Sequence, residues 1–391
     1  MKGTRGNRVQ VLGRRVIVEA FLRWIETAKT ADRARAANAL GRAYLQSRMS
    51  AEERAAAEMA MTFLLDDPSP RVRLALAEAV AWSPDAPRSL VLSLAADQPE
   101  IACHAVTCSP LLTDADLVDL AARGNGATRM LIAARARVTR PVSAALAEVG
   151  DDEELLCLLE NEGAVISSLS LKRIAERLGG CCDIRNLLLE RSDLPADARQ
   201  LLTQHVSNAL IGLPLAQAAI GLQRLQRISR EATEAAIVSI AGDIAPREIP
   251  DLVEHLRLNG RLTPSFLMHA LCSGKVDFFA GAIVDLTGCG ERRVRAILAT
   301  GRMHAVRALY ESAGLPRDIS VIFVEATLLW REAARKAPGS VLGTVCGRLL
   351  EKFRRHDGAH GAVGELLDMV EKLHVAEQRQ SARVYAALAA A

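Results

Sequence analysis

The sequence predicts an all-α protein that contains a stacked array of short helical hairpins. Half of the 391 residues are hydrophobic but only 3% are aromatic, so the core must consist mainly of Ala, Leu, Val and Ile. Small and unbranched apolar residues of this kind form helices readily. No stretch shows the sustained alternation of apolar and polar residues that a half-buried sheet needs. Part of the chain also repeats itself, with two short helices expected per copy.

The segment 64–80, LLDDPSPRVRLALAEAV, predicts the first helix of such a repeat. Asp66 or Asp67 can accept hydrogen bonds from the unpaired N–H groups of a first helical turn. Pro68 and Pro70 fit that turn, because a residue there loses no hydrogen bond by lacking an N–H. An apolar stripe with helical spacing follows, made of Val72, Ala75, Leu76, Ala79 and Val80. One face of this helix is therefore expected to be buried.

Two stretches further along match one another. VAWSPDAPRSLVLSLAAD at 80–97 aligns with VTCSPLLTDADLVDLAAR at 106–123 at an offset of 26 residues. Ser83-Pro84 falls on Ser109-Pro110 in this alignment. Each Ser-Pro step is expected to end one short helix and lead into the next, because the residue before Pro disfavours the helical conformation.

The second of these copies also shows how its next helix begins. Thr113 with Asp116 resembles a capping box. Weaker copies begin near Arg140-Pro141 and at Gly163. A hairpin of this size cannot bury its apolar stripe without neighbours, so the repeats predict a stack of hairpins. A compact bundle with accidental self-similarity is the alternative.

The second half of the chain predicts helices of more varied length. Residues 184–240 suggest longer helices, one opening at Leu194-Pro195 and another running from about Leu215 to Ile228. From residue 261 the helices are expected to be shorter. Thr263-Pro264 is typical of a helix N-terminus, and Gly274 is typical of a helix end.

Two further patterns concern packing in this half. Three glycines, Gly339, Gly343 and Gly347, would form a flat strip on a helix and allow a neighbour to approach closely. Residues 361–389 predict a helix that caps the array or frays. The bulkiest apolar stripe of this half consists of Phe278, Phe279, Ile283 and Leu286.

These residues carry a resemblance to known families. DDPSPRVRLALAEAV resembles the first half of a HEAT repeat, with an acidic cap, a Pro and a Val-Arg pair before an Ala-rich helix. CSPLLTDADLVDLAARG and RSDLPADARQLLTQHVSNAL, among other stretches between 60 and 325, resemble the alphaproteobacterial family Domain of Unknown Function 2336. CHAVTC at 103–108 departs from the aliphatic step common in that family. The resemblance implies HEAT-like α-helical repeats and no established reaction.

The expected architecture is therefore a HEAT-like α-solenoid of short helical hairpins followed by a C-terminal helical region. We expect basic N-terminal helices over 1–60 and HEAT-like repeats over 61–180. A helical, repeat-like region is expected over 181–340, and capping helices over 341–391.

Charge is unevenly distributed along the chain. The net charge is +3, but residues 1–48 contain eleven Lys or Arg and three acids. Arg14 and Arg15 in this segment are candidate contacts for nucleic acid or an acidic partner. A second candidate is the basic cluster at 292–307, and its leading residues are Arg292, Arg293 and Arg295. A solvated helix face is the alternative interpretation of both.

The sequence indicates a cytoplasmic protein without membrane insertion. Charges at Glu19 and Arg23 interrupt the apolar part of the N-terminus, which argues against a signal peptide. The longest mostly apolar run, at 209–222, is shorter than the roughly 20 residues that span a bilayer. The eight cysteines include no CxxC pair and no zinc spacing, so reduced thiols and no bound metal are expected.

The patterns that could support catalysis each have a simpler interpretation. His356 and His360 have the spacing of metal ligands on a helix, but Gly358 between them disfavours a helix. The thiol of Cys103 adjoins a histidine in sequence, yet neighbouring helical residues point to different faces. Four acids at 151–154 fit a helix N-terminus, where the helix dipole favours negative charge. We therefore expect no enzyme activity and no cofactor.

The leading functional hypothesis is a non-enzymatic scaffold or adaptor, because stacked hairpins offer an extended, curved surface to protein partners. The alternative is a nucleic-acid-binding HEAT-like protein that uses the basic N-terminus and the cluster at 292–307. Balanced overall charge and few aromatic residues make nucleic acid the less favoured partner.

Overall fold

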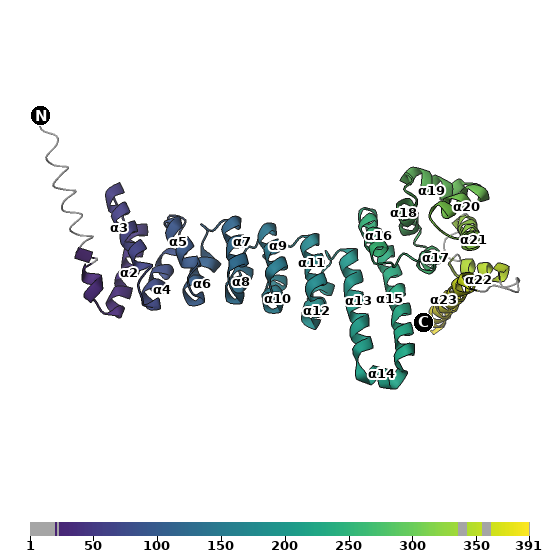
Figure 1. Ribbon diagram of the computed structural model, residues 1–391, viewed down its shortest axis with the longest axis horizontal. Helices are drawn as coiled ribbons and strands as arrows, with labels where there is room; N and C mark the ends of the chain where they lie inside the picture. Colours follow the sequence, from purple (N-terminus) through teal and green to yellow (C-terminus); the bar gives the residue numbers. More distant parts are fainter. Residues whose placement is uncertain (1–19, 22, 335–341, 354–360, 391) are drawn as a thin grey trace, which may run out of the picture. The chain divides into compact units, whose positions relative to one another are not determined.

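The computed structural model describes residues 20, 21, 23–334, 342–353 and 361–390. Within these residues every regular element is a helix, which confirms the predicted all-α class (Figure 1). An isolated β-bridge joins Val138 and Ala164. None of the described helices combines the length and the apolar character needed to cross a bilayer.

The chain divides into two compact units, Met1–Asp193 and Leu194–Ala391. The four-part division expected from the sequence stays a prediction. Unit 1 contains α2 (Thr30–Gln46), α3 (Ala51–Leu64), α4 (Pro70–Val80), α5 (Arg88–Ala95), α6 (Pro99–Cys108), α7 (Asp114–Arg123), α8 (Gly126–Ala133), α9 (Arg140–Val149), α10 (Asp152–Glu160), α11 (Ser168–Leu178) and α12 (Cys182–Glu190). Unit 2 contains α13 (Ala196–Gly212), α14 (Pro214–Ile220), α15 (Leu222–Asp243), a short 3₁₀ helix (Pro246–Glu248), α16 (Ile249–Leu258), α17 (Pro264–Cys272), α18 (Val276–Thr287), α19 (Glu291–Thr300), α20 (Met303–Ser312), α21 (Arg317–Ala334), α22 (Leu342–Phe353) and α23 (Ala362–Ala390).

Helix α4 shows how the predicted stripe packs. Val72, Leu76 and Val80 are fully buried, and α4 packs against both α2 and α6. The approach to α2 is close, since a Cβ added at Gly41 would lie 2.8 Å from the Cβ of Ala79. Glycine at that point of α2 therefore lets the two helices pack closely.

The predicted cap of α4 is wrong. The helix begins at Pro70, so Ser69 is its N-cap residue, and neither Asp66 nor Asp67 occupies that position. Asp67 instead accepts a 2.9 Å hydrogen bond from the Ser69 N–H and binds Arg33 of α2 at 2.7 Å. An arginine distant in sequence thus redirects this carboxylate, which a local pattern cannot reveal.

The two Ser-Pro corners have matching geometry. The hydroxyl of Ser83 accepts a hydrogen bond from the N–H of Asp85 at 3.1 Å, and Ser109 accepts one from Leu111 at 3.2 Å. Helix α4 ends just before the first corner and α6 ends just before the second. The predicted capping box is confirmed, because Thr113 accepts from the Asp116 N–H and Asp116 accepts from the Thr113 N–H.

Successive helices of unit 1 pack in two series. Helices α4, α6, α8, α10 and α12 each contact the next in that order, and α7, α9 and α11 do the same. Figure 1 shows these helices standing side by side within the unit. The buried side chains of these helices are mainly small and aliphatic.

Unit 2 begins with a long hairpin of α13 and α15. The sequence predicts one helix over 215–228, but α14 ends at Ile220 and α15 starts at Leu222. Gly221 between them has φ +85°, a left-handed conformation that breaks the helix. The predicted start of α17 is confirmed, since Thr263 accepts a hydrogen bond from the Phe266 N–H at 3.2 Å.

The bulky stripe of α18 forms the core of the rest of unit 2. Phe278, Phe279 and Ile283 are buried, and Gly274 with φ +78° ends the preceding helix as predicted. Of the predicted glycine strip, Gly347 lies close to the ring of His374 on α23. Gly339 lies outside the described residues.

Candidate functional site

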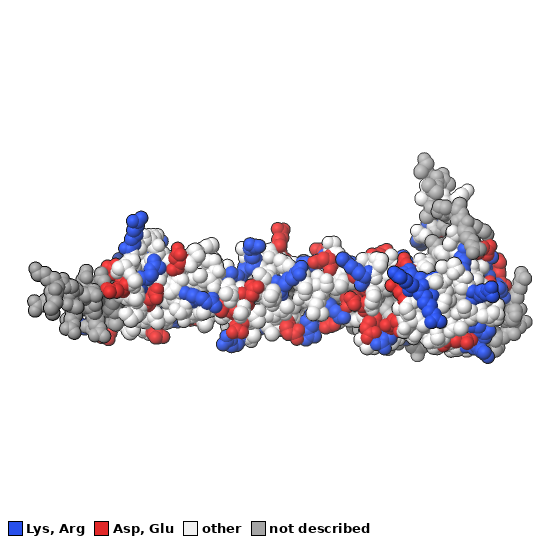
Figure 2. Space-filling view, turned by 90° about the horizontal axis from the view of Figure 1, so that it is seen from above, with Lys and Arg blue, Asp and Glu red and all other residues white. Residues whose placement is uncertain are grey.

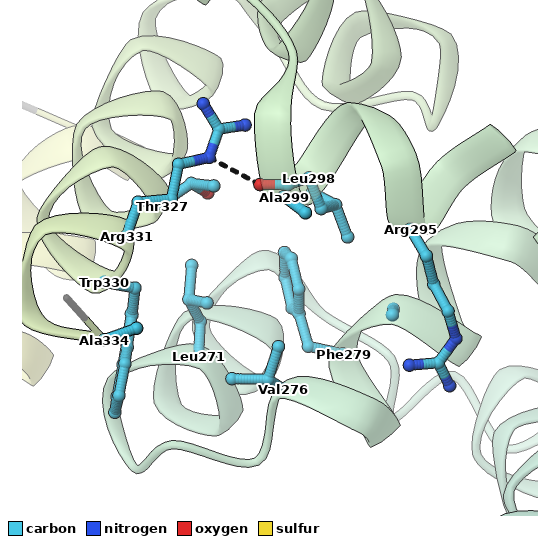
Figure 3. A pocket seen from close by; sticks show the side chains of 11 residues that line it. Leu271, Val276, Phe279, Arg295, Leu298, Ala299, Thr327, Trp330, Arg331 and Ala334 are labelled. Atoms are coloured by element: carbon cyan, nitrogen blue, oxygen red, sulfur yellow. Dashed lines mark hydrogen bonds between the residues drawn. The ribbon is translucent and has the colours of Figure 1, made fainter. Parts of the chain in front are cut away.

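Unit 2 contains an apolar pocket of about 290 Å³ formed by α17, α18, α19 and α21 (Figure 3). Leu271, Val276 and Phe279 lie along one side, and Leu298 and Ala299 lie opposite them. The remaining lining residues are Ala280, Arg295, Thr327, Trp330, Arg331 and Ala334. Both long-range helix packing and the local aromatic stripe of α18 are therefore needed to form the pocket.

An aromatic cluster packs against the lining residue Phe279. The ring of Phe279 stacks on that of Phe323 with centroids 6.0 Å apart, and Tyr310 lies 5.6 Å from Phe323. The hydroxyls of Tyr310 and Thr327 form a 2.5 Å hydrogen bond, and Thr327 donates to the Phe323 carbonyl at 2.8 Å. Burial raises the pKa of Tyr310, so the phenol stays neutral and donates to Thr327. These contacts hold Phe279 and Thr327 in fixed positions on the pocket wall.

Arg331 on α21 fastens the opposite wall. Its guanidinium donates to the carbonyls of Ile297 at 2.6 Å, Leu298 at 2.6 Å and Gly301 at 2.7 Å. The last carbonyls of a helix lack partners within the helix, so an arginine satisfies them well. Figure 3 shows the bond to Leu298 across the top of the pocket. Helices α19 and α21 are thereby held at a fixed separation.

One arginine of the predicted cluster, Arg295 of α19, lies at this pocket. Arg295 lines it and pairs with Asp277 at 2.6 Å and with Glu291 at 2.8 Å. The hydrogen bond to Asp277, followed by that to Glu291, raises the pKa of Arg295. Arg292 and Arg293 are exposed and form no ion pair with any described residue. Only part of the predicted cluster is thus available to a partner.

The other predicted basic residues also include both paired and unpaired arginines. Arg307 pairs with Glu311 at 3.0 Å, whereas Arg302 is exposed and unpaired within the described part of the chain. Arg14 and Arg15 lie outside the described residues. Figure 2 shows basic side chains interspersed with acidic ones over unit 1 on the face seen there.

The chemistry of the pocket favours binding. Trp330 has a buried Nε1 atom without a hydrogen-bond partner among the described residues. Arg331 and Thr327 already use their polar groups within the protein. The lining residues include no carboxylate, imidazole or thiol. The pocket can therefore hold an apolar group.

Unit 1 has a more polar hollow of about 480 Å³ beside α5, α7 and α8. Asp97, Asp116 and Asp119 line it. Each is paired with an arginine: Arg73 at 2.6 Å, Arg88 at 2.8 Å and Arg123 at 2.9 Å respectively. Because these charges are compensated, this hollow offers little electrostatic attraction to a ligand.

The acidic residues at 151–154 serve helix α10. Asp151 and Glu154 form a capping box at its N-terminus, and Glu154 also binds Arg129 of α8 at 3.4 Å. The thiol of Cys103 donates to the carbonyl of Glu100 at 3.2 Å. Across the described residues, no group of His, Cys, Asp and Glu could hold a metal ion. His356 and His360 lie outside that part of the chain.

These features define an all-α protein of successive short helices whose second unit contains an apolar pocket. The chain belongs to the bacterial family described as "Uncharacterised protein conserved in bacteria (DUF2336)", whose model matches residues 101–361. This confirms the predicted family, although the match begins later and extends further than the resemblance at 60–325. No curated protein and no solved structure matches the chain.

Proposed function

We propose that the chain is a non-enzymatic, HEAT-like scaffold of the bacterial cytoplasm that binds protein partners through the pocket of unit 2. The partner contributes a segment with one bulky apolar side chain and acidic residues beside it. The observation that carries this proposal is an apolar pocket of about 290 Å³ next to exposed, unpaired arginines. We also propose that the protein is alphaproteobacterial, because its sequence resembles a family from these bacteria.

The apolar lining supports an apolar anchor. A cavity of about 150 Å³ lined by apolar side chains can hold benzene, so this pocket has room for a bulky side chain. Removing such a side chain from water contributes roughly 1.5–3 kcal/mol.

The charge at the rim supports acidic residues in the partner. Arg292 lies three residues before Arg295 and seven before Ala299, so all three share one face of α19. Ala299 and Arg295 line the pocket. An acidic residue beside the anchor can therefore pair with Arg292, which favours association and fixes the direction of binding.

The two-series packing of unit 1 supports the HEAT-like part of the proposal. Helices that each contact the second next along the chain are typical of helical-repeat scaffolds. Ion pairs and hydrogen bonds connect neighbouring repeats, such as Arg73 with Asp97 and Arg135 with the Ser109 carbonyl. The eight cysteines carry free thiols, as expected in a reducing cytoplasm.

A library of random peptides displayed on phage tests this proposal with the full-length chain. The wild type should enrich peptides with one bulky apolar residue flanked by Asp or Glu. Ala299→Trp fills the pocket mouth and should abolish this enrichment. Ala296→Trp is the matched control, because Ala296 is exposed on the same helix and does not line the pocket. Absence of a consensus, or its retention by Ala299→Trp, would contradict the proposal.

Nucleic-acid binding is the second candidate, favoured by the exposed and unpaired Arg292, Arg293 and Arg302. Binding to phosphates is strongest at low salt. A gel-shift titration with duplex DNA at two salt concentrations distinguishes the candidates. Salt-sensitive binding that Arg292→Gln with Arg293→Gln removes, and that Ala299→Trp leaves intact, would favour nucleic acid over a peptide.

A further inference from the structure

The hairpin of α13, α14 and α15 in unit 2 ends in an exposed apolar tip. Helix α14 has no buried residue and packs only lightly on α13 and α15 (Figure 1). Leu215 is 83% exposed, Leu213 is 52% exposed and Leu222 is 47% exposed. The other large apolar side chains exposed along the hairpin are Val206, Leu210, Ile220 and Ile228. Exposed large apolar side chains gathered on one hairpin indicate an interaction site.

Local contacts hold the tip in a defined conformation. The Gln217 amide donates to the Ile211 carbonyl at 2.7 Å and so fastens α14 to the end of α13. Pro214 starts α14, and Gly221 makes the turn into α15 with φ +85°. The apolar side chains of the tip are therefore presented together by an ordered turn.

The charge along this hairpin has a single sign over a long distance. Residues 198–230 contain no Asp or Glu. Arg224, Arg227 and Arg230 are exposed on α15 directly after the tip, and none forms an ion pair with a described residue. Their spacing of three residues places them along one side of the helix. Apolar groups at the tip are thus followed by a basic strip.

We propose that this tip docks onto an anionic lipid bilayer. The leucines enter the boundary between headgroups and acyl chains, and the three arginines bind lipid phosphates beside them. An apolar anchor combined with a basic patch supplies the two contributions that stable peripheral attachment needs. This attachment does not require a helix that crosses the bilayer. None of the described helices is long and apolar enough to do so.

The charge pattern favours a bilayer over a second copy of the chain. Two tips packed against each other would bring Arg224, Arg227 and Arg230 of one copy near those of the other. Like charges in contact disfavour association, whereas anionic headgroups neutralise them. Self-association is therefore an outcome that the experiment must detect. The tip shares no residue with the α17–α21 pocket, so this proposal does not depend on the peptide-binding proposal.

Co-sedimentation of the full-length chain with vesicles tests the proposal. The protein should sediment with vesicles of phosphatidylglycerol and phosphatidylcholine, and not with vesicles of phosphatidylcholine alone. Leu215→Glu should weaken binding at least about tenfold, because it replaces an inserted apolar group by a charge. Leu169→Glu is the matched control, since Leu169 is 77% exposed on α11.

The basic strip is tested in the same assay. Arg224→Gln with Arg227→Gln should weaken binding about fivefold per arginine, and added salt should weaken wild-type binding. Arg137→Gln with Arg140→Gln, two exposed arginines with the same spacing in unit 1, should bind like the wild type. Lack of binding to anionic vesicles, or equal binding by Leu215→Glu, would overturn the proposal. A dimer in light scattering that Leu215→Glu dissociates, without vesicle binding, would replace it by self-association.

Discussion

Arg73 of α4 forms a bidentate ion pair with Asp97, with Nε–Oδ2 and Nη2–Oδ1 distances of 2.6 and 3.1 Å. The same guanidinium donates to the Asp67 carbonyl at 2.6 Å. Asp97 lies in the loop between α5 and α6, and Asp67 lies in the loop between α3 and α4. One arginine therefore connects the α3–α4 loop with the α5–α6 loop of unit 1.

Loss of this connection should destabilise unit 1. Both side chains of the pair are less than one fifth exposed, so Arg73→Ala should lower the free energy of unfolding by about 2 kcal/mol. Arg123→Ala should cost less than about 0.5 kcal/mol, because its pair with Asp119 is largely exposed. Urea denaturation measures both. A loss for Arg73→Ala as small as that for Arg123→Ala would show that the Arg73 pair contributes no more than an exposed ion pair.

The buried Ser-Pro corner should matter more than the exposed one. Ser109 is fully buried, and Ser109→Ala removes the acceptor for the Leu111 N–H at a cost of about 1 kcal/mol. Ser83 makes the equivalent bond at an exposed position, so Ser83→Ala should cost about half as much or less. Thermal unfolding of the two variants measures both costs. Equal costs would contradict the expectation that the more buried corner contributes more to stability.

Arg331 should be the main support of the pocket wall. Arg331→Met removes hydrogen bonds to three carbonyls at the C-terminal end of α19, including that of Gly301 just after the helix, and should cost about 3 kcal/mol. Arg295→Gln is the control on the facing helix, where an exposed ion pair contributes less than about 1 kcal/mol. Denaturant unfolding compares them, and a small effect of Arg331→Met would mean that packing alone positions α19.

The stability of unit 2 should fall in mild acid because of His269. Burial lowers the pKa of this imidazole from 6.5 to about 4. The unfolded chain therefore binds a proton between these values that the folded chain does not, so stability present above pH 6.5 is lost as the pH falls towards 4. Between pH 7.5 and pH 5 the loss is about 2 kcal/mol. His269→Gln should reduce this pH dependence by that amount in denaturation curves, and an unchanged dependence would contradict it.

Local sequence patterns predicted the helices well. The apolar spacing of Val72, Leu76 and Val80 and the capping box of Thr113 depend on near neighbours, so both were predictable. The cap at Asp67 was not, because Arg33 of another helix competes for that carboxylate. The helix over 215–228 failed because a glycine inside an apolar run was not recognised as a break at Gly221.

The candidate sites were less accessible from the sequence. The pocket requires α18, α19 and α21 to meet, and only tertiary packing brings Phe279, Leu298 and Trp330 together. Sequence patterns indicated the arginines of α19 but could not show that Arg295 is paired while Arg292 is free. The tip of the α13–α15 hairpin had a detectable signal, the long run without acids at 198–230, which charge counts over the whole chain conceal.

The most direct test of peptide binding in unit 2 is the dissociation constant of one selected peptide, measured by isothermal titration calorimetry. Relative to the wild type, Ala299→Trp should weaken binding at least about thirtyfold, a loss of roughly 2 kcal/mol, because the apolar anchor can no longer enter the pocket. Ala296→Trp should change the dissociation constant less than about twofold, because Ala296 is exposed and does not line the pocket. Equal affinities for all three proteins would show that the pocket is not the binding site.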